Sequence, residues 1–275
     1  MGKKQFLLDA DKCTSCHMCV IACKDEHVDA SYAPWTGPQP DTGHFWADIR
    51  TLERGEIPRV KLTHMPVFCQ HCDDAPCISV CPDDAIKKRD DGLLWIDEKA
   101  CTGCGECGPA CPYDVIFMNA EIGVAQKCTG CAHRVDQGLL PRCADVCPHD
   151  AILFGEEGDA IFQNREGEKP LETWLPEAKA APRAFWRGLP KPWIAGAVVD
   201  PAKDEVVIGA SVSVADEAGN TFTASSDAFG NFRVAELSAG KSYNVTISAS
   251  GFAPVSHSVT LKGDHDLGTI EVHNG

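Results

Sequence analysis

The second part of the chain alternates apolar and polar positions in short runs, which are separated by turns that contain glycine. Val212 and Val214 flank a serine, and Tyr243, Val245 and Ile247 are likewise separated by single polar residues. A period of two is the pattern of a β-strand with one buried face. The pattern predicts seven strands, at residues 193–199, 210–214, 221–224, 229–235, 242–249, 255–261 and 267–272. Seven strands within about 80 residues are typical of a β-sandwich.

The first part of the chain has shorter apolar runs, set among cysteine-rich loops. Leu93–Ile96 and Val115–Met118 predict two short strands. Asp91 followed by Gly92 indicates a hairpin turn. Short strands and hairpins between loops of this kind favour a ferredoxin-like α+β domain.

A polar stretch with four prolines, at positions 170, 176, 182 and 190, separates the two parts. Such sequence indicates an extended connector. We therefore expect a cysteine-rich domain at residues 1–155, a connector at 156–190 and the β-sandwich at 191–275. The first domain contains an insertion at 32–58, rich in aromatic and turn residues, which we interpret as a cap or, alternatively, as a surface for docking a partner.

All sixteen cysteines lie between Cys13 and Cys147. The N-terminal residues show neither the apolar core of an export signal nor a twin arginine. Disulfides persist mainly in exported proteins, so metal binding is the better interpretation of these thiols. The same observation leads us to expect a cytoplasmic protein, or a periplasmic one if a partner subunit carries a twin-arginine signal.

The cysteines form four runs of four. The first and third have the spacing of bacterial ferredoxins, while the second and fourth each widen one gap. The runs are Cys13, Cys16, Cys19 and Cys23; Cys69, Cys72, Cys77 and Cys81; Cys101, Cys104, Cys107 and Cys111; and Cys128, Cys131, Cys143 and Cys147. Three closely spaced thiolates let one loop bind three corners of an iron–sulfur cubane, and in two-cluster ferredoxins the fourth cysteine binds the other cluster. Four complete runs therefore predict four [4Fe–4S] clusters.

An internal repeat supports this interpretation. The sequence Cys-Pro-x-Asp, followed by Ala or Val and then Ile, occurs at residues 81–86, 111–116 and 147–152. Zinc also binds four thiolates, but its sites usually combine two separated C-x2-C pairs. With sixteen thiolates available, four histidines near the runs are expected to be neighbouring donors or surface residues rather than ligands. They are His17, His71, His133 and His149.

The charge of the chain excludes some partners. Aspartate and glutamate outnumber lysine and arginine by 40 to 25, which gives a formal charge of −15. This balance argues against binding to nucleic acid or to an anionic membrane surface. No stretch approaches the roughly 20 apolar residues that cross a bilayer. No set of acid, base and nucleophile is evident either, so we predict no catalytic residue.

Residues 5–155 resemble the iron–sulfur subunits that accompany molybdopterin enzymes of the dimethyl sulfoxide reductase family. Besides the cysteine runs, the resemblance rests on the segments 43–46, 53–55, 69–72, 124–128 and 141–143. The C-terminal strands resemble transthyretin-like or carboxypeptidase regulatory-like modules. Within the family, this combination is most similar to the small subunits of pyrogallol–phloroglucinol transhydroxylases. The resemblance implies a heterodimer, or a higher multiple of it, whose large subunit holds molybdenum on two molybdopterin guanine dinucleotides while the small subunit holds only clusters.

The family also implies which cysteines share a cluster. The four sets are Cys13, Cys16, Cys19 and Cys147 (cluster 1); Cys23, Cys128, Cys131 and Cys143 (cluster 2); Cys69, Cys72, Cys77 and Cys111 (cluster 3); and Cys81, Cys101, Cys104 and Cys107 (cluster 4). Every iron is then fully coordinated, which implies that no cluster binds substrate. The third run is complete here, whereas the transhydroxylase small subunits lack part of it and carry three clusters. A complete set suits net delivery of electrons.

Three functions remain open from the sequence. The first is an electron-transfer subunit of a molybdenum enzyme that acts on a polyphenol, by transhydroxylation or reductive dehydroxylation. The second is the same role for an oxyanion or sulfoxide reductase. The third is a free multi-cluster ferredoxin that uses its sandwich as a binding module. In each of them, the chain alone is expected to turn over no organic substrate.

Overall fold

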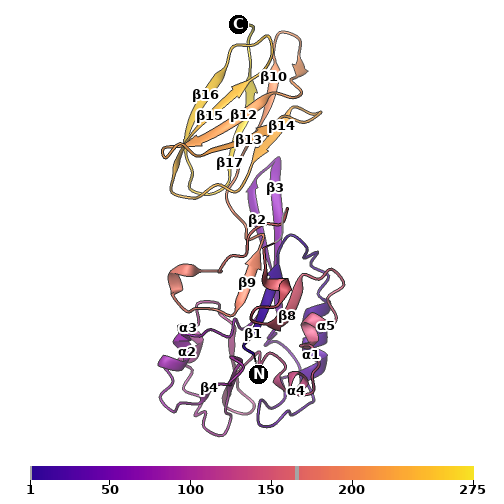
Figure 1. The fold of residues 1–275 in the computed structure, drawn as a ribbon, viewed down its shortest axis with the longest axis vertical. Helices are drawn as coiled ribbons and strands as arrows, with labels where there is room; N and C mark the ends of the chain where they lie inside the picture. Colours follow the sequence, from indigo (N-terminus) through magenta and orange to yellow (C-terminus); the bar gives the residue numbers. More distant parts are fainter. Residues whose placement is uncertain (1, 165–166) are drawn as a thin grey trace. The chain divides into compact units, whose positions relative to one another are not determined.

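The computed structural model describes residues 2–164 and 167–275, which form two compact units (Figure 1). Unit 1 comprises the residues up to Leu52 together with Thr63–Leu189, and unit 2 comprises Glu53–Leu62 together with Pro190–Gly275. A ten-residue segment from the first part of the sequence therefore belongs to the same compact unit as the C-terminal residues.

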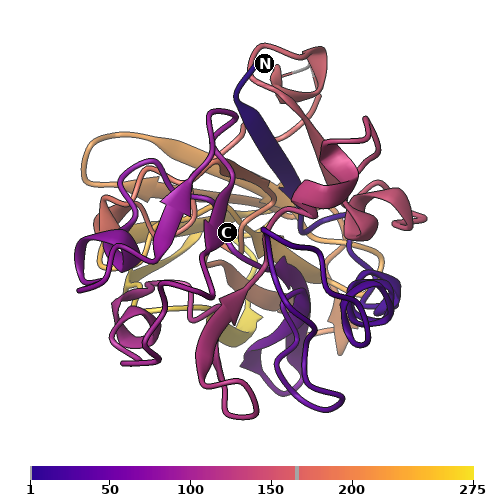
Figure 2. The same cartoon turned by 90° about the horizontal axis from the view of Figure 1, so that it is seen from below.

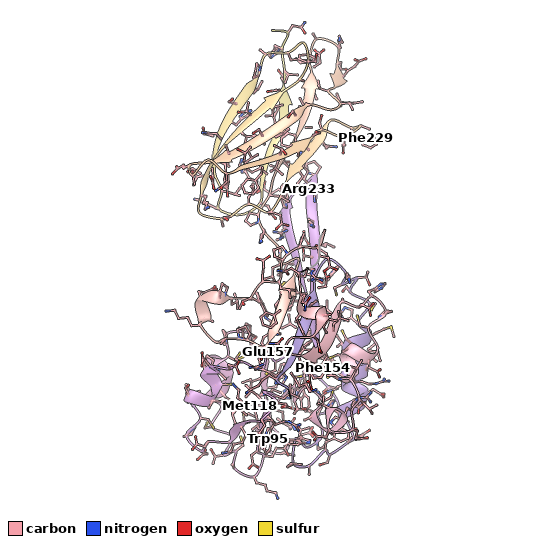
Figure 3. The ribbon with its side chains drawn as sticks, in the orientation of Figure 1. Trp95, Met118, Phe154, Glu157, Phe229 and Arg233 are labelled. Atoms are coloured by element: carbon pink, nitrogen blue, oxygen red, sulfur yellow. The ribbon has the colours of Figure 1, made fainter. Side chains whose placement is uncertain are left out.

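The central element of unit 1 is a three-stranded sheet. Its middle strand, β1 (Lys4–Asp9), pairs antiparallel with β8 (Ile152–Glu156) and parallel with β9 (Ala184–Arg187). Five of the six residues of β1 are buried. The Phe6 ring lies 4.7 Å from that of Phe154, which is labelled in Figure 3. This apolar contact joins the two ends of the cysteine-rich sequence.

The strand β9 lies within the polar stretch that the sequence presents as a connector. Trp186 in this strand is fully buried, and its indole N–H donates to Gln70 Oε1 at 3.0 Å. Trp174 packs on the same indole at a ring-centroid distance of 5.4 Å. Burial of large aromatic rings and the pairing with β1 hold this part of the chain on unit 1.

Two short hairpins adjoin the cysteine loops. One pairs β4 (Ile86–Lys88) with β5 (Leu94–Ile96), and the other pairs β6 (Ile116–Asn119) with β7 (Val124–Lys127). Gly92 has a φ of +89° in the first turn, the conformation that the Asp-Gly pair predicted. A third hairpin, formed by the strands Asp48–Glu56 (β2) and Arg59–Val67 (β3), carries the segment that belongs to unit 2.

The helices of unit 1 are short, and Figure 2 shows them from a second direction. They are α1 (Met18–His27), α2 (Pro76–Ser79), α3 (Cys107–Ala110), α4 (Ala132–Val135), α5 (Arg142–Asp145) and the 3₁₀ turns η1 (Ala160–Phe162) and η2 (Pro176–Ala178). Among the residues described, no helix has both the length and the apolar character needed to cross a membrane.

Unit 2 is a β-sandwich of two four-stranded sheets, and all seven predicted strands are present. One sheet has the order β11–β10–β14, with β17 also paired to β10, and the other has the order β13–β12–β15–β16. The strands are β10 (Ile194–Asp200), β11 (Glu205–Val206), β12 (Ser211–Asp216), β13 (Thr221–Ser225), β14 (Asn231–Val234), β15 (Ser242–Ser248), β16 (Val255–Thr260) and β17 (His265–Glu271). The eighth strand, β11, has two residues, too few to produce an alternating pattern.

The core of the sandwich follows the alternation that the sequence shows. Val212, Val214, Val245 and Ile247 are fully buried. The predicted fold class, ferredoxin-like α+β modules followed by an all-β sandwich, is confirmed.

The segment Glu53–Leu62 packs on the sandwich through charged side chains. Arg59 Nη1 lies 2.8 and 3.0 Å from the two carboxylate oxygens of Asp266, and its Nη2 donates to Asn231 Oδ1 at 2.9 Å. Gly55, with a φ of +85°, leaves room for the Trp193 ring, because a Cβ there would lie 2.6 Å from that ring. Ion pairing and a close backbone approach thus attach this segment to the sandwich.

Candidate iron–sulfur cluster sites

The cysteine runs lie in loops that lead into short helices. In the second run, Cys69 and Cys72 follow β3, and Cys77 lies in α2. Each loop contains residues with a positive φ, a conformation that turns the chain sharply. These residues are Ser15 and His17, then His71, then Gly103 and Gly105, then Gly130 and Cys131. The sharp turns allow closely spaced cysteines to face a common cavity.

The repeated Cys-Pro-x-Asp sequence forms a turn that provides a hydrogen bond to sulfur. Its aspartates adopt a positive φ, which aspartate tolerates better than most residues. The angles are +47° at Asp84, +52° at Asp114 and +50° at Asp150. As a result, the Ala85 N–H donates to Cys81 Sγ at 3.2 Å, and the Ala151 N–H donates to Cys147 Sγ at 3.3 Å. After Cys23, by contrast, the chain continues as helix α1.

The structure brings cysteines from distant runs together at three cavities. Each cavity, together with the open solvent at its mouth, holds about 290 to 320 Å³ outside protein atoms. The cysteines lining them are Cys13, Cys16, Cys19 and Cys147; Cys23, Cys128, Cys131 and Cys143; and Cys81, Cys101, Cys104 and Cys107. These are the sets expected for clusters 1, 2 and 4.

The cysteines expected for cluster 3 also lie close together. Burial raises the pKa of Cys72 far above its usual range, and the neighbouring charges of Cys69, Cys77 and Cys111 raise it further. These effects require the four thiols to be near one another in unit 1 but do not define one site. Three of the four expected sets line a cavity each, and the assignment of all four sets as ligands stays a prediction.

The cysteines of these sites need a positive charge among them if they are to act as thiolates. Burial first, and then the charges of other cysteines, raise the pKa of Cys19 and Cys77 to about 12 each. Four such thiols do not stay ionised together at neutral pH unless a positive charge lies among them. An iron–sulfur core supplies that charge and uses thiolates as its ligands.

The arrangement of the thiols also bears on zinc as an alternative occupant. Zinc–sulfur bonds are about 2.3 Å, so four thiolates around zinc converge on one point. In the part of the chain that is described, no three or more Cys, His, Asp or Glu side chains are arranged to bind a single metal ion. Twelve of the thiols instead line three cavities, four thiols to each.

The two exposed cysteines belong to different sets. Cys16, in the set for cluster 1, and Cys104, in the set for cluster 4, are exposed, while the other fourteen are buried or half-buried. The exposed Met118 lies 3.8 Å from the Cβ position of Gly103, the residue before Cys104, and the exposed Met18 and Ile21 follow Cys16 in the sequence. Each of these two sets thus contains one cysteine that is open to solvent.

The four histidines singled out in the sequence occupy different surroundings. His17 and His149 are exposed at the wall of the first cavity. His133 Nε2 lies 3.0 Å from a carboxylate oxygen of Glu26. Burial raises the pKa of the Glu26 carboxyl, but the hydrogen bond from His133 and the charge of Arg134 lower it by more, so the net shift is downward. His71 is fully buried between two cysteine sets.

The insertion at 32–58 contributes to the wall of the second cavity. Trp46 is 1% exposed and lines this cavity, with its ring 4.9 Å from that of His27. Trp35, earlier in the insertion, packs edge-on against Trp95, a residue labelled in Figure 3. Both indoles therefore pack within unit 1, an arrangement that supports a cap for the first part of the insertion, whereas residues 53–58 belong to unit 2.

Sequence reasoning missed Lys127. This residue is 2% exposed, and its ammonium donates to Leu94 O at 2.6 Å and to Cys128 O at 3.0 Å. Burial raises the pKa of Cys128 to about 12, and the Lys127 charge partly opposes that rise. A signal was available, because Lys127 directly precedes a cysteine of the fourth run. A lysine at such a position is buried only where it meets negative charge.

Comparison with known proteins agrees with this arrangement. The model of the 4Fe-4S dicluster domain matches residues 60–157, and that of the carboxypeptidase regulatory-like domain matches residues 194–272. The pyrogallol hydroxytransferase small subunit of Pelobacter acidigallici is 31% identical in an alignment that covers 99% of this chain and 100% of that protein. The chain belongs to the family of iron–sulfur subunits of dimethyl sulfoxide reductase-type molybdopterin enzymes.

Other members of this iron–sulfur subunit family match a shorter part of the chain. A tetrathionate reductase subunit of Salmonella typhimurium is 34% identical over 67% of this chain and 72% of that protein. The arsenate respiratory reductase iron–sulfur subunit of Shewanella sp. is 31% identical over 66% of this chain and 94% of that protein. As a member of the family, the chain is a non-catalytic, electron-transfer subunit of a molybdopterin oxidoreductase and works with a catalytic partner.

Proposed function

We propose that the chain transfers electrons for a molybdenum enzyme that acts on polyphenols, by transhydroxylation or reductive dehydroxylation. It holds four [4Fe–4S] clusters in the sets numbered 1 to 4 above. Its large partner subunit holds molybdenum on two molybdopterin guanine dinucleotides, and the complex is a heterodimer or a multiple of it in the cytoplasm. The observation that carries the polyphenol assignment is the extent of likeness: the Pelobacter subunit matches 99% of the chain, sandwich included, whereas the tetrathionate reductase subunit matches 67%.

The residues of this chain perform the parts of electron transfer that a protein supplies. Thiolates hold the iron, and backbone N–H groups, such as those of Ala85 and Ala151, donate to cysteine sulfurs. Such bonds favour the more negative, reduced state. When bound, the clusters accept and release single electrons. Because Cys16 and Cys104 are exposed and belong to different sets, electrons have one place to enter and another to leave.

A second candidate is supported by the complete third run. Four full ligand sets suit net electron delivery from one redox partner to another, as an oxyanion or sulfoxide reductase requires. The tetrathionate and arsenate reductase relatives match the cysteine-rich part of the chain. This candidate keeps the role of the chain and changes only the substrate of its partner. A free multi-cluster ferredoxin would lack that partner altogether.

The test is anaerobic co-expression of the chain with a molybdopterin-type large subunit from the same genome. The purified complex is assayed with pyrogallol and, separately, with tetrathionate and dimethyl sulfoxide as electron acceptors. Turnover of pyrogallol, together with close to sixteen iron and sixteen sulfide per chain, supports the proposal. Turnover of an oxyanion or sulfoxide alone moves the function to the second candidate. The chain without its partner serves as the control and is expected to turn over none of these compounds.

A further inference from the structure

His71 lies at the junction between two cysteine sets of unit 1. It stands between Cys69 and Cys72 in the sequence, within the set for cluster 3. Its Nε2 nonetheless lies 3.9 Å from Cys128 Sγ, which belongs to the set for cluster 2. The imidazole is 0% exposed. One buried side chain therefore connects the second cysteine loop with the fourth.

The hydrogen bonds of the ring determine which nitrogen carries the proton. The backbone N–H of Leu94 donates to His71 Nδ1 at 2.9 Å, so Nδ1 is an acceptor and bears no hydrogen. In a neutral imidazole the hydrogen is then on Nε2, the atom that faces Cys128. His71 is thus a hydrogen-bond donor to the cysteine sulfur, and the protein backbone fixes it in that role.

The surroundings hold the ring in place. The Phe6 ring stacks on the imidazole with an interplanar angle of 16° and a centroid distance of 5.9 Å. Gly130 faces the same ring, and a Cβ at this glycine would lie 3.4 Å from Nε2. A Cβ at Gly130 would thus meet the imidazole at ordinary contact distance but would lie 2.8 Å from Leu93 Cδ2, so a larger residue there would have to displace Leu93.

Lys127 adds a positive charge to the same junction. Its ammonium donates to the carbonyl oxygens of Leu94 and Cys128 and, among the residues described, forms no ion pair with a carboxylate. A buried ammonium requires negative charge nearby. Clusters bound by thiolates carry net negative charge, and the ammonium lies where two of the proposed clusters would be neighbours.

From this geometry we propose that His71 tunes the reduction potential of the cluster that Cys128 would hold, by donating its Nε2–H to the Cys128 sulfur. The inference rests on the proposed assignment of Cys128 to cluster 2. His71 would keep its proton when that cluster gains or loses an electron, so the change would need no proton donor or acceptor. Because the N–H group stabilises added negative charge on sulfur, its loss lowers the potential of the cluster on Cys128.

The experiment is a redox titration of the complete chain, followed by electron paramagnetic resonance, for the wild type and for His71→Leu and His71→Gln. Glutamine places an amide N–H near the position of Nε2, whereas leucine has no donor. In His71→Leu we expect one signal to titrate at a lower potential, with at least a tenfold change in its reduced-to-oxidised ratio at fixed potential. For a one-electron couple this change corresponds to about 59 mV. In His71→Gln we expect that signal to remain close to its wild-type potential.

Three further variants make the result decisive. Cys131→Ser identifies the signal of cluster 2, because it alters a ligand of that set alone. His17→Leu is the matched control, since His17 also has a positive φ, +58°, but lies in the first loop. It is expected to leave the cluster 2 signal unchanged. If His71→Leu binds iron poorly, His71→Asn replaces it, because asparagine tolerates a positive φ but its shorter amide does not reproduce the position of Nε2.

The proposal is overturned if the cluster 2 signal of His71→Leu, or of His71→Asn where it replaces that variant, titrates as in the wild type. It is also overturned if the signal of His71→Gln shifts as much as the signal of that variant. Either result is independent of the substrate of the partner subunit. A complex that turns over tetrathionate instead of pyrogallol would refute the polyphenol function and leave the role of His71 intact.

Discussion

The ion pair between Arg59 and Asp266 provides a quantitative test of how the segment 53–62 is attached to the sandwich. The two side chains are 16% and 13% exposed, and Arg59 contacts both carboxylate oxygens. Arg59→Met removes the guanidinium and keeps most of the apolar stem. Asp266 then retains the N–H of Gly268, at 2.9 Å, but loses its cation.

The free energy of local opening that Arg59→Met is expected to remove lies between two known limits. Exposed ion pairs contribute about 0–1 kcal/mol, and removing one partner of a buried pair costs about 3–5 kcal/mol. The low exposure of both side chains, and the remaining hydrogen bond to Asp266, place the loss at about 2–3 kcal/mol. Since about 1.36 kcal/mol is a factor of ten, local opening should become about 30- to 160-fold more frequent.

Native-state hydrogen exchange of the full chain measures this opening directly. Peptides from β14 and β17 carry Asn231 and Asp266, so their amides should lose protection by that factor in Arg59→Met. Lys203→Met is the matched control, because Lys203 is 69% exposed and lies 3.7 Å from Asp200 in the same unit. The reasoning is refuted if protection of β17 changes less than twofold, or if Lys203→Met has an equal effect.

Three further outcomes are expected. Cys147→Ser should damage the cluster bound by Cys13, Cys16 and Cys19 and leave the signals of clusters 3 and 4 intact, as measured by iron content and electron paramagnetic resonance; loss confined to clusters 3 and 4 would contradict the pairing. Truncation after Pro190 should preserve iron and reduced-state spectra but weaken co-purification with the large subunit, because it removes most of unit 2; unchanged assembly would instead favour a separate binding role for the sandwich. The pKa of Glu26 is lowered from its usual 4.5 because His133 and Arg134 outweigh burial, so its contribution to stability is present above that pH and is lost as the pH falls below it. Glu26→Gln should therefore flatten the loss of unfolding free energy between neutral and acid pH, as measured by denaturant unfolding at several pH values, and an unchanged pH profile would argue against it.

The sequence predicts much of this molecule because its strongest signals are local. Alternation at Val212 and Val214 marks a strand whatever its partner, and the spacing of Cys101, Cys104 and Cys107 defines one loop. The attachment of residues 53–62 to the sandwich could not be predicted in this way. It depends on Arg59 meeting Asp266, more than 200 residues later, and one charged residue among many carries no mark of its distant partner.

The same reasoning explains what was missed at the candidate sites. The sequence shows His71 beside Cys72, its neighbour in the chain, but the contact that gives it a role is with Cys128. Likewise, Trp186 stands in a polar, proline-containing stretch, and its burial depends on β9 pairing with β1. Both arrangements come from tertiary packing, which periodicity and spacing do not describe.

The gathering of cysteines from distant runs also sets an order in which the sites can be completed as the ribosome makes the chain. The cavity with Cys101 has its last cysteine at position 107, whereas the cavity with Cys13 must wait for Cys147. The set that contains the first three cysteines of the chain is therefore the last of the cavity-lining sets to be completed. At roughly 5–20 residues per second, its thiols wait about 6 to 26 s after Cys19 has been added. Oxidants have that interval in which to reach three unprotected thiols, so protection of the nascent chain matters most at its N-terminal run.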